Sequence, residues 1–216
     1  MKLAQLNLPK YILEYYHQFT DLTPIQEKAI KADLLGGKSL LICAPTASGK
    51  TLIATMAMVN NLPKGKVIYL VPLKALANEK FKEYSRLLEG TKYQAIMSTS
   101  DIDSESSYLA RYNVLILTTE KLDSLLRHKV SWIKEVNTVI IDEIHLLNDP
   151  TRGPTLEVII TLLKRMIQPQ LIGLSATIGN PQELAQWLES DLVFDQWRPV
   201  KLKQGIRQNQ KTVFYD

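Results

Sequence analysis

Residues 44–51 read APTASGKT and combine small side chains with one glycine, one lysine and one threonine. The stretch follows an apolar run at 39–44, and a helix is expected directly after it. A tight turn at this point aims several backbone N–H groups at one place, where the start of a helix adds positive potential. The stretch therefore predicts a binding site for a phosphate chain.

The spacing fits the phosphate-loop pattern G-x-x-x-x-G-K-[ST], with Ala44 in place of the first glycine. Gly49 lets the turn close, Lys50 reaches the β- and γ-phosphates, and Thr51 offers a hydroxyl to magnesium. ATP and Mg²⁺ are therefore the predicted cofactors. The loop residues expected to bind the nucleotide are Ala44, Pro45, Thr46, Ala47, Ser48, Gly49, Lys50 and Thr51.

Two further groups of polar residues follow apolar runs. The sequence DEIH begins at Asp142, which can hold the metal, and Glu143 can take a proton from an attacking water. After the next apolar run comes SAT, where Ser175 and Thr177 offer hydroxyls near the γ-phosphate. Glu143 and Lys50 are the predicted catalytic residues, and Asp142 and Thr51 the predicted magnesium ligands.

The elements that must position these residues alternate along the chain. Five runs rich in Ile, Val and Leu predict buried parallel strands, and 92–97 is a more polar sixth candidate. The five runs are 39–44, 66–71, 113–118, 137–142 and 170–175. Helical patterns occupy 23–37, 72–90 and 180–188, the first with Gly36 as a stop signal. This alternation predicts an α/β fold with a doubly wound parallel sheet, which binds ligands at the carboxyl ends of its strands.

Size and composition set further limits. The chain has 216 residues, 45% of them hydrophobic, which suits one large domain or at most two small ones. No apolar run approaches the length of a membrane span, so no membrane partner is expected. The chain has a single cysteine, Cys43, so it can form no internal disulfide, and a reducing compartment is expected. Cys43 lies in an apolar run and is expected to be a core residue. The net charge of +4 permits a nucleic-acid partner without requiring one.

The phosphate loop, DEIH and SAT, in that order, resemble the first RecA-like motor domain of a DExH-box helicase of superfamily 2. Residues 22–30 look like the Q motif of that family, 71–79 like motif Ia and 118–126 like motif Ib. The resemblance implies that Gln26 reads the adenine edge and that His145, Ser175 and Thr177 couple the two sites. The residues that it implies for nucleic-acid contact are Pro72, Lys74, Thr118, Thr119 and Arg152.

Longer stretches narrow the resemblance. DEIHLLNDPTRGPTLE, GLSATIGNPQELAQWL and WRPV are similar to the Ski-like branch, and most of all to archaeal Hjm-type DNA helicases. That similarity implies ATP-dependent 3′–5′ unwinding of single-stranded or forked DNA in replication-fork repair. It implies a cytoplasmic, nucleoid-associated monomer. Residues 1–200 would form the first motor domain with its N-terminal Q-motif region, and 201–216 a hairpin or linker toward a second RecA-like domain.

Several alternatives stay open from the sequence alone. The function could be that of a Ski-like RNA helicase, or of a nucleotide-dependent switch or binding module that unwinds nothing. Thr118 and Thr119 can contact phosphate, cap the following helix or do both. Lys74 can contact phosphate or simply lie at the start of a helix. His145 can link the two sites or serve the fold alone, and Arg152 can support the groove or pair with Glu157.

Overall fold

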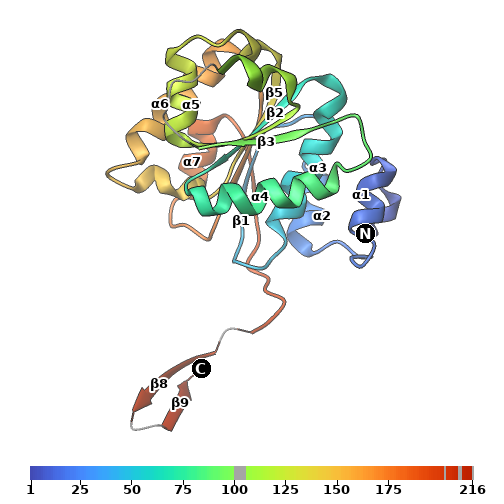
Figure 1. Ribbon diagram of the computed structural model, residues 1–216. Helices are drawn as coiled ribbons and strands as arrows, with labels where there is room; N and C mark the ends of the chain where they lie inside the picture. Colours follow the sequence, from blue (N-terminus) through green and yellow to red (C-terminus); the bar gives the residue numbers. More distant parts are fainter. Residues whose placement is uncertain (100–105, 202, 209–210, 216) are drawn as a thin grey trace.

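The protein is described by a computed structural model that covers residues 1–99, 106–201, 203–208 and 211–215. Its centre is a seven-stranded sheet with the order β3-β4-β2-β5-β6-β1-β7, in which every neighbouring pair is parallel. Figure 1 shows the twist of this sheet. The strands are β1 (Leu40–Cys43), β2 (Lys66–Val71), β3 (Ala95–Ser98), β4 (Val114–Thr118), β5 (Val136–Ile141), β6 (Gln170–Ser175) and β7 (Asp191–Phe194).

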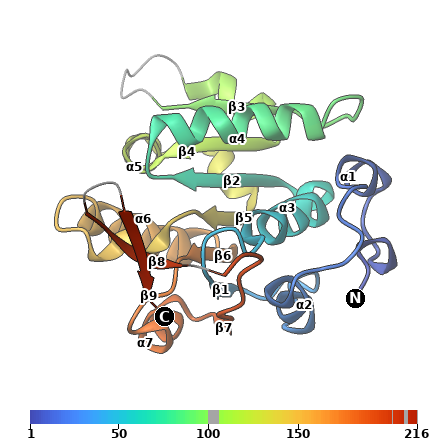
Figure 2. The same ribbon diagram turned by 90° about the horizontal axis from the view of Figure 1, so that it is seen from below.

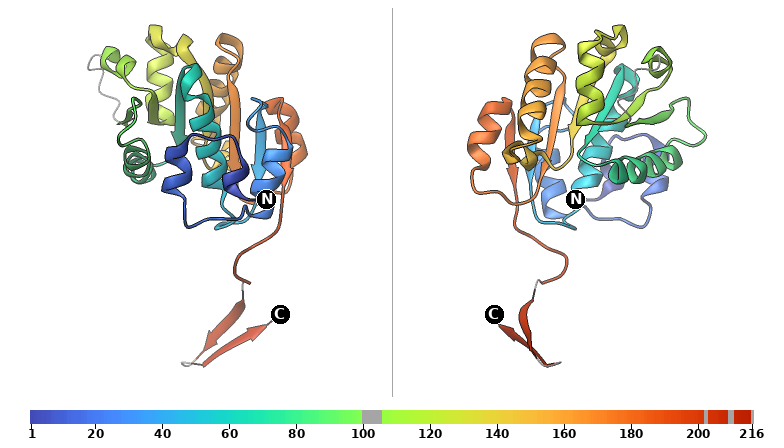
Figure 3. Two further views of the ribbon diagram at one scale, coloured as in Figure 1. Left: turned by 90° about the vertical axis from the view of Figure 1, so that its right-hand side faces the viewer. Right: turned by 60° about the vertical axis from the view of Figure 1, so that its left-hand side comes forward.

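Helices cover both faces of the sheet (Figures 2 and 3). The α-helices are α1 (Lys10–Tyr15), α2 (Pro24–Lys31), α3 (Lys50–Asn61), α4 (Lys74–Leu87), α5 (Thr119–Arg127), α6 (Gly153–Met166) and α7 (Pro181–Leu188). The 3₁₀ helices are η1 (Leu3–Gln5), η2 (Leu62–Lys64), η3 (Ser106–Arg111), η4 (Ser131–Glu135) and η5 (Ile144–Asn148). Within the described ranges, no helix is both long and apolar enough to cross a membrane.

Two apolar cores lie on opposite faces of the sheet, because successive strand residues point to opposite sides. The helices α1 to α4 pack on the face that holds Tyr69 and Val71 of β2. The helices α5 to α7 pack on the face that holds Ile68 and Leu70. Residues on both faces of the central strands are buried, which explains their continuous apolar runs.

The predicted α/β fold with a doubly wound parallel sheet is confirmed, and strands form at all six predicted runs. Cys43 is fully buried in the second core, as predicted for a core residue. The extent of the first predicted helix was wrong, since α2 ends at Lys31 rather than near Gly36. Asp33 adopts a left-handed conformation (φ 67°), and this turn ends the helix before the glycines are reached.

The end of the chain forms a separate antiparallel hairpin of β8 (Gln204–Gln208) and β9 (Lys211–Tyr215). Figures 1 and 3 show that it projects from the body of the molecule on an extended segment. Ile206 and Val213 face each other across the hairpin, and both are largely exposed. The predicted role of this segment as a linker toward a second domain stays a prediction.

Candidate functional site: a phosphate loop beside paired carboxylates

The phosphate loop runs from the end of β1 into the first turn of α3. Gly49 (φ 95°) and Ala47 (φ 64°) both have left-handed backbone conformations, which curl the loop so that its N–H groups converge. Gly49 is needed for a second reason, because a Cβ there would collide with the side-chain amide of Gln26. The buried hydroxyl of Ser48 has no hydrogen-bond partner among the described residues. The loop is therefore a concave backbone surface that suits an anion.

The Lys50 ammonium lies inside this loop. It donates hydrogen bonds to the carbonyl oxygens of Ala44 at 2.7 Å and Pro45 at 3.0 Å. Burial lowers the pKa of Lys50, whereas the nearby carboxylates of Glu143 and Asp142 act in the opposite direction. The phosphate loop and the paired carboxylates are thus close enough for their charges to interact, as the sequence predicted.

Asp142 and Glu143 follow β5 and have separate surroundings. The carboxylate of Asp142 accepts hydrogen bonds from the backbone N–H of Glu143 and from the hydroxyl of Tyr69, both at 3.0 Å. Glu143 has a left-handed backbone (φ 50°) at the junction between β5 and η5. Its carboxylate lies 3.2 Å from Nδ1 of His145. Two neighbouring acids can therefore perform different tasks.

The SAT segment lies between these two parts of the site, because β6 is the strand between β1 and β5. The carbonyl oxygen of Ser175 accepts a hydrogen bond from the N–H of Ala44 at 3.2 Å. The Ser175 hydroxyl is buried without a partner among the described residues, and Thr177 is exposed. The structure thus brings SAT to the phosphate loop, whereas the coupling role of His145, Ser175 and Thr177 stays a prediction.

Gln26 differs from the expectation in one respect. Its side chain is only 4% exposed, and both ends of the amide are engaged within the protein. Oε1 accepts from the backbone N–H of Thr23 at 2.9 Å, and Nε2 donates to the carbonyl oxygen of Gly49 at 2.9 Å. The hydroxyl of Thr23 donates a hydrogen bond to the carbonyl oxygen of Ser48, the residue before Gly49, at 2.8 Å. Gln26 therefore links the phosphate loop to α2 through hydrogen bonds. Recognition of adenine by Gln26 stays a prediction, and it requires the amide to exchange one of these hydrogen bonds for one to the base.

Four of the five residues implied for nucleic-acid contact lie at the ends of β2 and β4, on the other half of the sheet edge. Pro72 is half-buried and Lys74 is exposed at the start of α4. Thr118 is buried, and its hydroxyl accepts a hydrogen bond from the N–H of Lys121, which makes it the N-cap of α5. Thr118 therefore caps α5, and its contact with phosphate stays a prediction. Thr119 is also buried, so little of its side chain is accessible to a phosphate group.

Arg152 occupies the boundary between the two halves of the edge. It lines a cavity of about 10 Å³, the size of one water, together with Pro72, Thr119, Asp142 and Glu143. Both possible roles of Arg152, support of the groove and pairing with Glu157, stay predictions. The alternative partner, Glu157, is exposed on α6.

The family comparison matches residues 23–184 to the DEAD/DEAH box helicase family. This range contains the phosphate loop, the paired carboxylates and SAT. The chain belongs to the DEAD/DEAH box helicases. ATP binding follows from this membership. The sheet order explains how the phosphate loop, the paired carboxylates and SAT meet at one edge of the sheet.

Curated DEAD/DEAH box relatives include archaeal helicases, which confirms the resemblance seen in the sequence. The chain is 49% identical over 213 residues to "ATP-dependent DNA helicase Hel308" of Methanocaldococcus jannaschii, a match covering 94% of this chain and 18% of the relative. The protein of the same name from Pyrococcus abyssi is 48% identical over 210 residues, covering 95% and 29% respectively. The chain thus spans less than a third of the length of these two relatives.

Solved structures of another helicase share the fold. The crystal structure of DUF1998 helicase MrfA superposes with a TM-score of 0.75 at 24% identity, covering 88% of this chain and 33% of that one. The structure of MrfA bound to DNA and AMPPNP gives a TM-score of 0.74 at 24% identity, covering 88% and 29%. At this identity the comparison supports the fold alone.

A close backbone contact beside the DEAD/DEAH box carboxylates leads to a stability prediction. The first residue of α6, Gly153, packs so closely on η5 that a Cβ would collide with the carbonyl oxygen of Leu147. Gly153→Ala should therefore lower the free energy of unfolding by about 1–3 kcal/mol, measured by chemical denaturation. Gly179→Ala is the control, because a Cβ there meets nothing within 4 Å. Equal stability of the two variants would contradict the close contact.

Proposed function

We propose that this chain is the first motor domain of an ATP-dependent DNA helicase. The observation that carries the proposal is the strand order β5-β6-β1, which gathers the paired carboxylates, SAT and the phosphate loop at adjacent strand ends. The names of the relatives support DNA as the partner. Single-stranded or forked DNA, 3′–5′ movement and replication-fork repair are the finer parts of this proposal.

The donor set fits a nucleotide with magnesium. A threonine hydroxyl at the start of α3 and the Asp142 carboxylate are the hard oxygen ligands that Mg²⁺ prefers. When bound, the metal would neutralise phosphate charge. Lys50 would bind the β- and γ-phosphates, and Glu143 would accept the proton of the attacking water. The hydroxyls of Ser48 and Ser175 are buried and lack partners among the described residues. If these hydroxyls bound the phosphates, they would give up no existing hydrogen bond.

The groove for nucleic acid would run over the ends of β2 and β4. Pro72, Lys74 and Arg152 are the residues there that best support contact with a strand. Lys74 carries an exposed charge, and Arg152 lies beside the carboxylates. A second RecA-like domain would form the other wall, with 201–216 leading toward it. We further propose a cytoplasmic monomer acting near the nucleoid.

Two other functions make different predictions for the same assay. An RNA helicase of the Ski-like branch would have its ATP turnover stimulated by RNA more than by DNA. A switch module without unwinding activity would respond to neither. Comparing the ATPase of the intact protein with single-stranded DNA, with RNA and with neither separates the three.

Lys50→Ala tests the nucleotide site itself. The change removes the only cation predicted to bind the β- and γ-phosphates, so the affinity of the intact protein for Mg-ATP should fall strongly in calorimetry. Lys10→Ala is a matched control, because Lys10 is an exposed lysine on α1 that pairs only with Glu14 among the described residues. Nucleotide binding by Lys50→Ala at the level of the control would overturn the site.

A further inference from the structure

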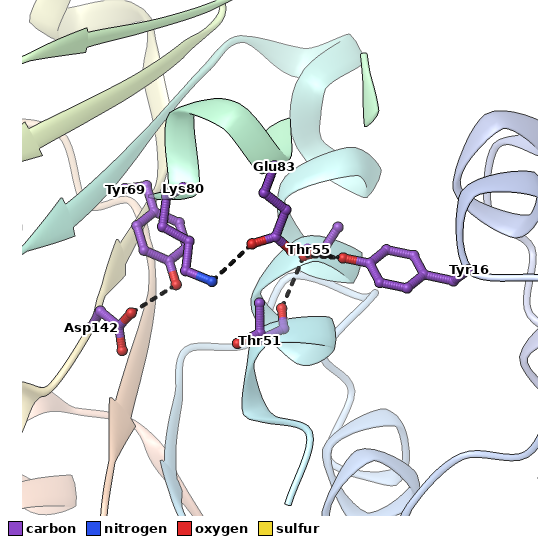
Figure 4. A network of polar contacts seen from close by, with 7 residues as sticks. All are labelled: Tyr16, Thr51, Thr55, Tyr69, Lys80, Glu83 and Asp142. Carbon is purple, nitrogen blue, oxygen red and sulfur yellow. Dashed lines mark hydrogen bonds and ion pairs between the residues drawn. The ribbon is translucent and has the colours of Figure 1, made fainter. Parts of the chain in front are cut away.

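A tyrosine on the strand next to β5 is aimed at Asp142. Tyr69 lies on β2, and its hydroxyl donates a hydrogen bond to Oδ2 of Asp142 at 3.0 Å (Figure 4). The register pairs Tyr69 with Ile140, so Tyr69 and Asp142 point to the same face of the sheet. The other carboxylate oxygen, Oδ1, accepts from the N–H of Glu143. Each oxygen of Asp142 is therefore fixed by one donor before any metal arrives.

The ring of Tyr69 is itself held firmly. It is fully buried and packs against the ring of Tyr84 on α4, with centroids 5.4 Å apart at 56°. The ammonium of Lys80 lies 6.0 Å from the centroid of the Tyr69 ring. This ammonium pairs with Glu83 at 2.9 Å, and Glu83 also accepts a hydrogen bond from Tyr16 at 3.0 Å (Figure 4). The ring of Tyr69 is therefore packed against side chains of α4, and one of them, Lys80, is held in turn by Glu83.

The chemistry of the pair is complementary. The phenolic hydroxyl of Tyr69 is a hydrogen-bond donor, and the carboxylate of Asp142 is an acceptor. A carboxylate offers about four acceptor positions, and the two bonds described use two of them. Two positions remain for a metal ion or for water bound to it. Donors of this kind orient metal ligands and tune their affinity.

We propose that Tyr69 is a positioning residue for the magnesium ligand Asp142, holding its carboxylate in the orientation that binds the metal. The inference rests on the proposed ATP-Mg²⁺ function of the site. It extends that function to a side chain in the middle of a buried strand, which contacts neither nucleotide nor metal itself.

Tyr69→Phe removes the hydroxyl and keeps the ring packing. In the intact protein, the Mg²⁺ concentration that half-saturates the binding of a fluorescent, non-hydrolysable ATP analogue should rise about 10- to 100-fold. Binding of the analogue in EDTA should be unchanged, and ATP turnover should recover at saturating Mg²⁺. These readouts separate an effect on the metal from a general loss of structure, which would reduce binding under every condition.

Tyr84→Phe is the matched control. Its hydroxyl is equally buried but makes no hydrogen bond to Asp142 or to any other carboxylate among the described residues. Its Mg²⁺ titration should match that of the unchanged protein. If Tyr69→Phe also matches, or if both variants shift equally, the positioning role is overturned. Lys50→Ala, measured in the same titration, distinguishes the proposed ATP-Mg²⁺ site from the proposed role of Tyr69. Undiminished Mg-ATP binding by Lys50→Ala would overturn the function of the site as a whole.

Discussion

The 216-residue chain alone should hydrolyse ATP about 10³- to 10⁵-fold more slowly than the intact protein. An arginine finger provides a factor of this size in related phosphoryl-transfer enzymes, because it stabilises the charge that develops on the γ-phosphate. The described residues form one RecA-like sheet, and its site lies at an open edge rather than between two domains. Water at that edge screens the charges of Lys50 and the carboxylates. ATP turnover of the chain and of the intact protein, with and without single-stranded DNA, measures the difference.

Binding of nucleic acid by the chain alone should be weak and should fall steeply as salt is added, because backbone contacts depend on the release of counterions. Nucleotide binding is the internal control, since the phosphate loop is complete within the chain. Strong DNA-stimulated turnover by the chain alone would show that a second domain is dispensable for ATP hydrolysis.

Glu143→Gln in the intact protein should keep ATP binding and lower hydrolysis by about 10²- to 10⁴-fold. An amide cannot accept the proton of the attacking water, although it keeps nearly the same size and shape. The left-handed turn at Glu143 does not depend on the charge of the side chain, so the position of Asp142 should be preserved. Phosphate release in a single turnover, beside equilibrium binding of ATP, separates chemistry from affinity.

Glu14→Gln provides the control for this change of charge, because Glu14 is exposed on α1. Its hydrolysis rate should equal that of the unchanged protein. A rate near that level in Glu143→Gln would assign the general base to another residue.

Much of the sheet could be predicted because central parallel strands are buried on both faces and therefore read as continuous apolar runs. The edge strand β7 escaped this reasoning. It is four residues long and begins at an exposed aspartate, Asp191, whose ladder partner is Leu40. Its apolar run is only three residues long and lies between Asp191 and Asp195, so it is too short to indicate a strand by itself.

The phosphate loop and the paired carboxylates were also predictable, since both are short segments whose chemistry depends on spacing. Contacts between distant segments were not. Gln26 meets Gly49 across 23 positions, and Tyr69 meets Asp142 across 73. A tyrosine within an apolar strand reads as a core residue, and nothing in its neighbours indicates that its hydroxyl faces a carboxylate. The sheet register supplies that information.

The place of β1 in the sheet has a consequence for how the protein is made. Both neighbours of this strand, β6 and β7, come late in the chain, and the contact between Ser39 and Leu171 spans 132 positions. At about 5–20 residues per second, a ribosome takes roughly 7–26 seconds to add that length. During this interval the strand that carries the phosphate loop has no ladder partner. The nascent chain therefore acquires its nucleotide site late, and an apolar segment around 40–43 is open to chaperones until β6 and β7 emerge.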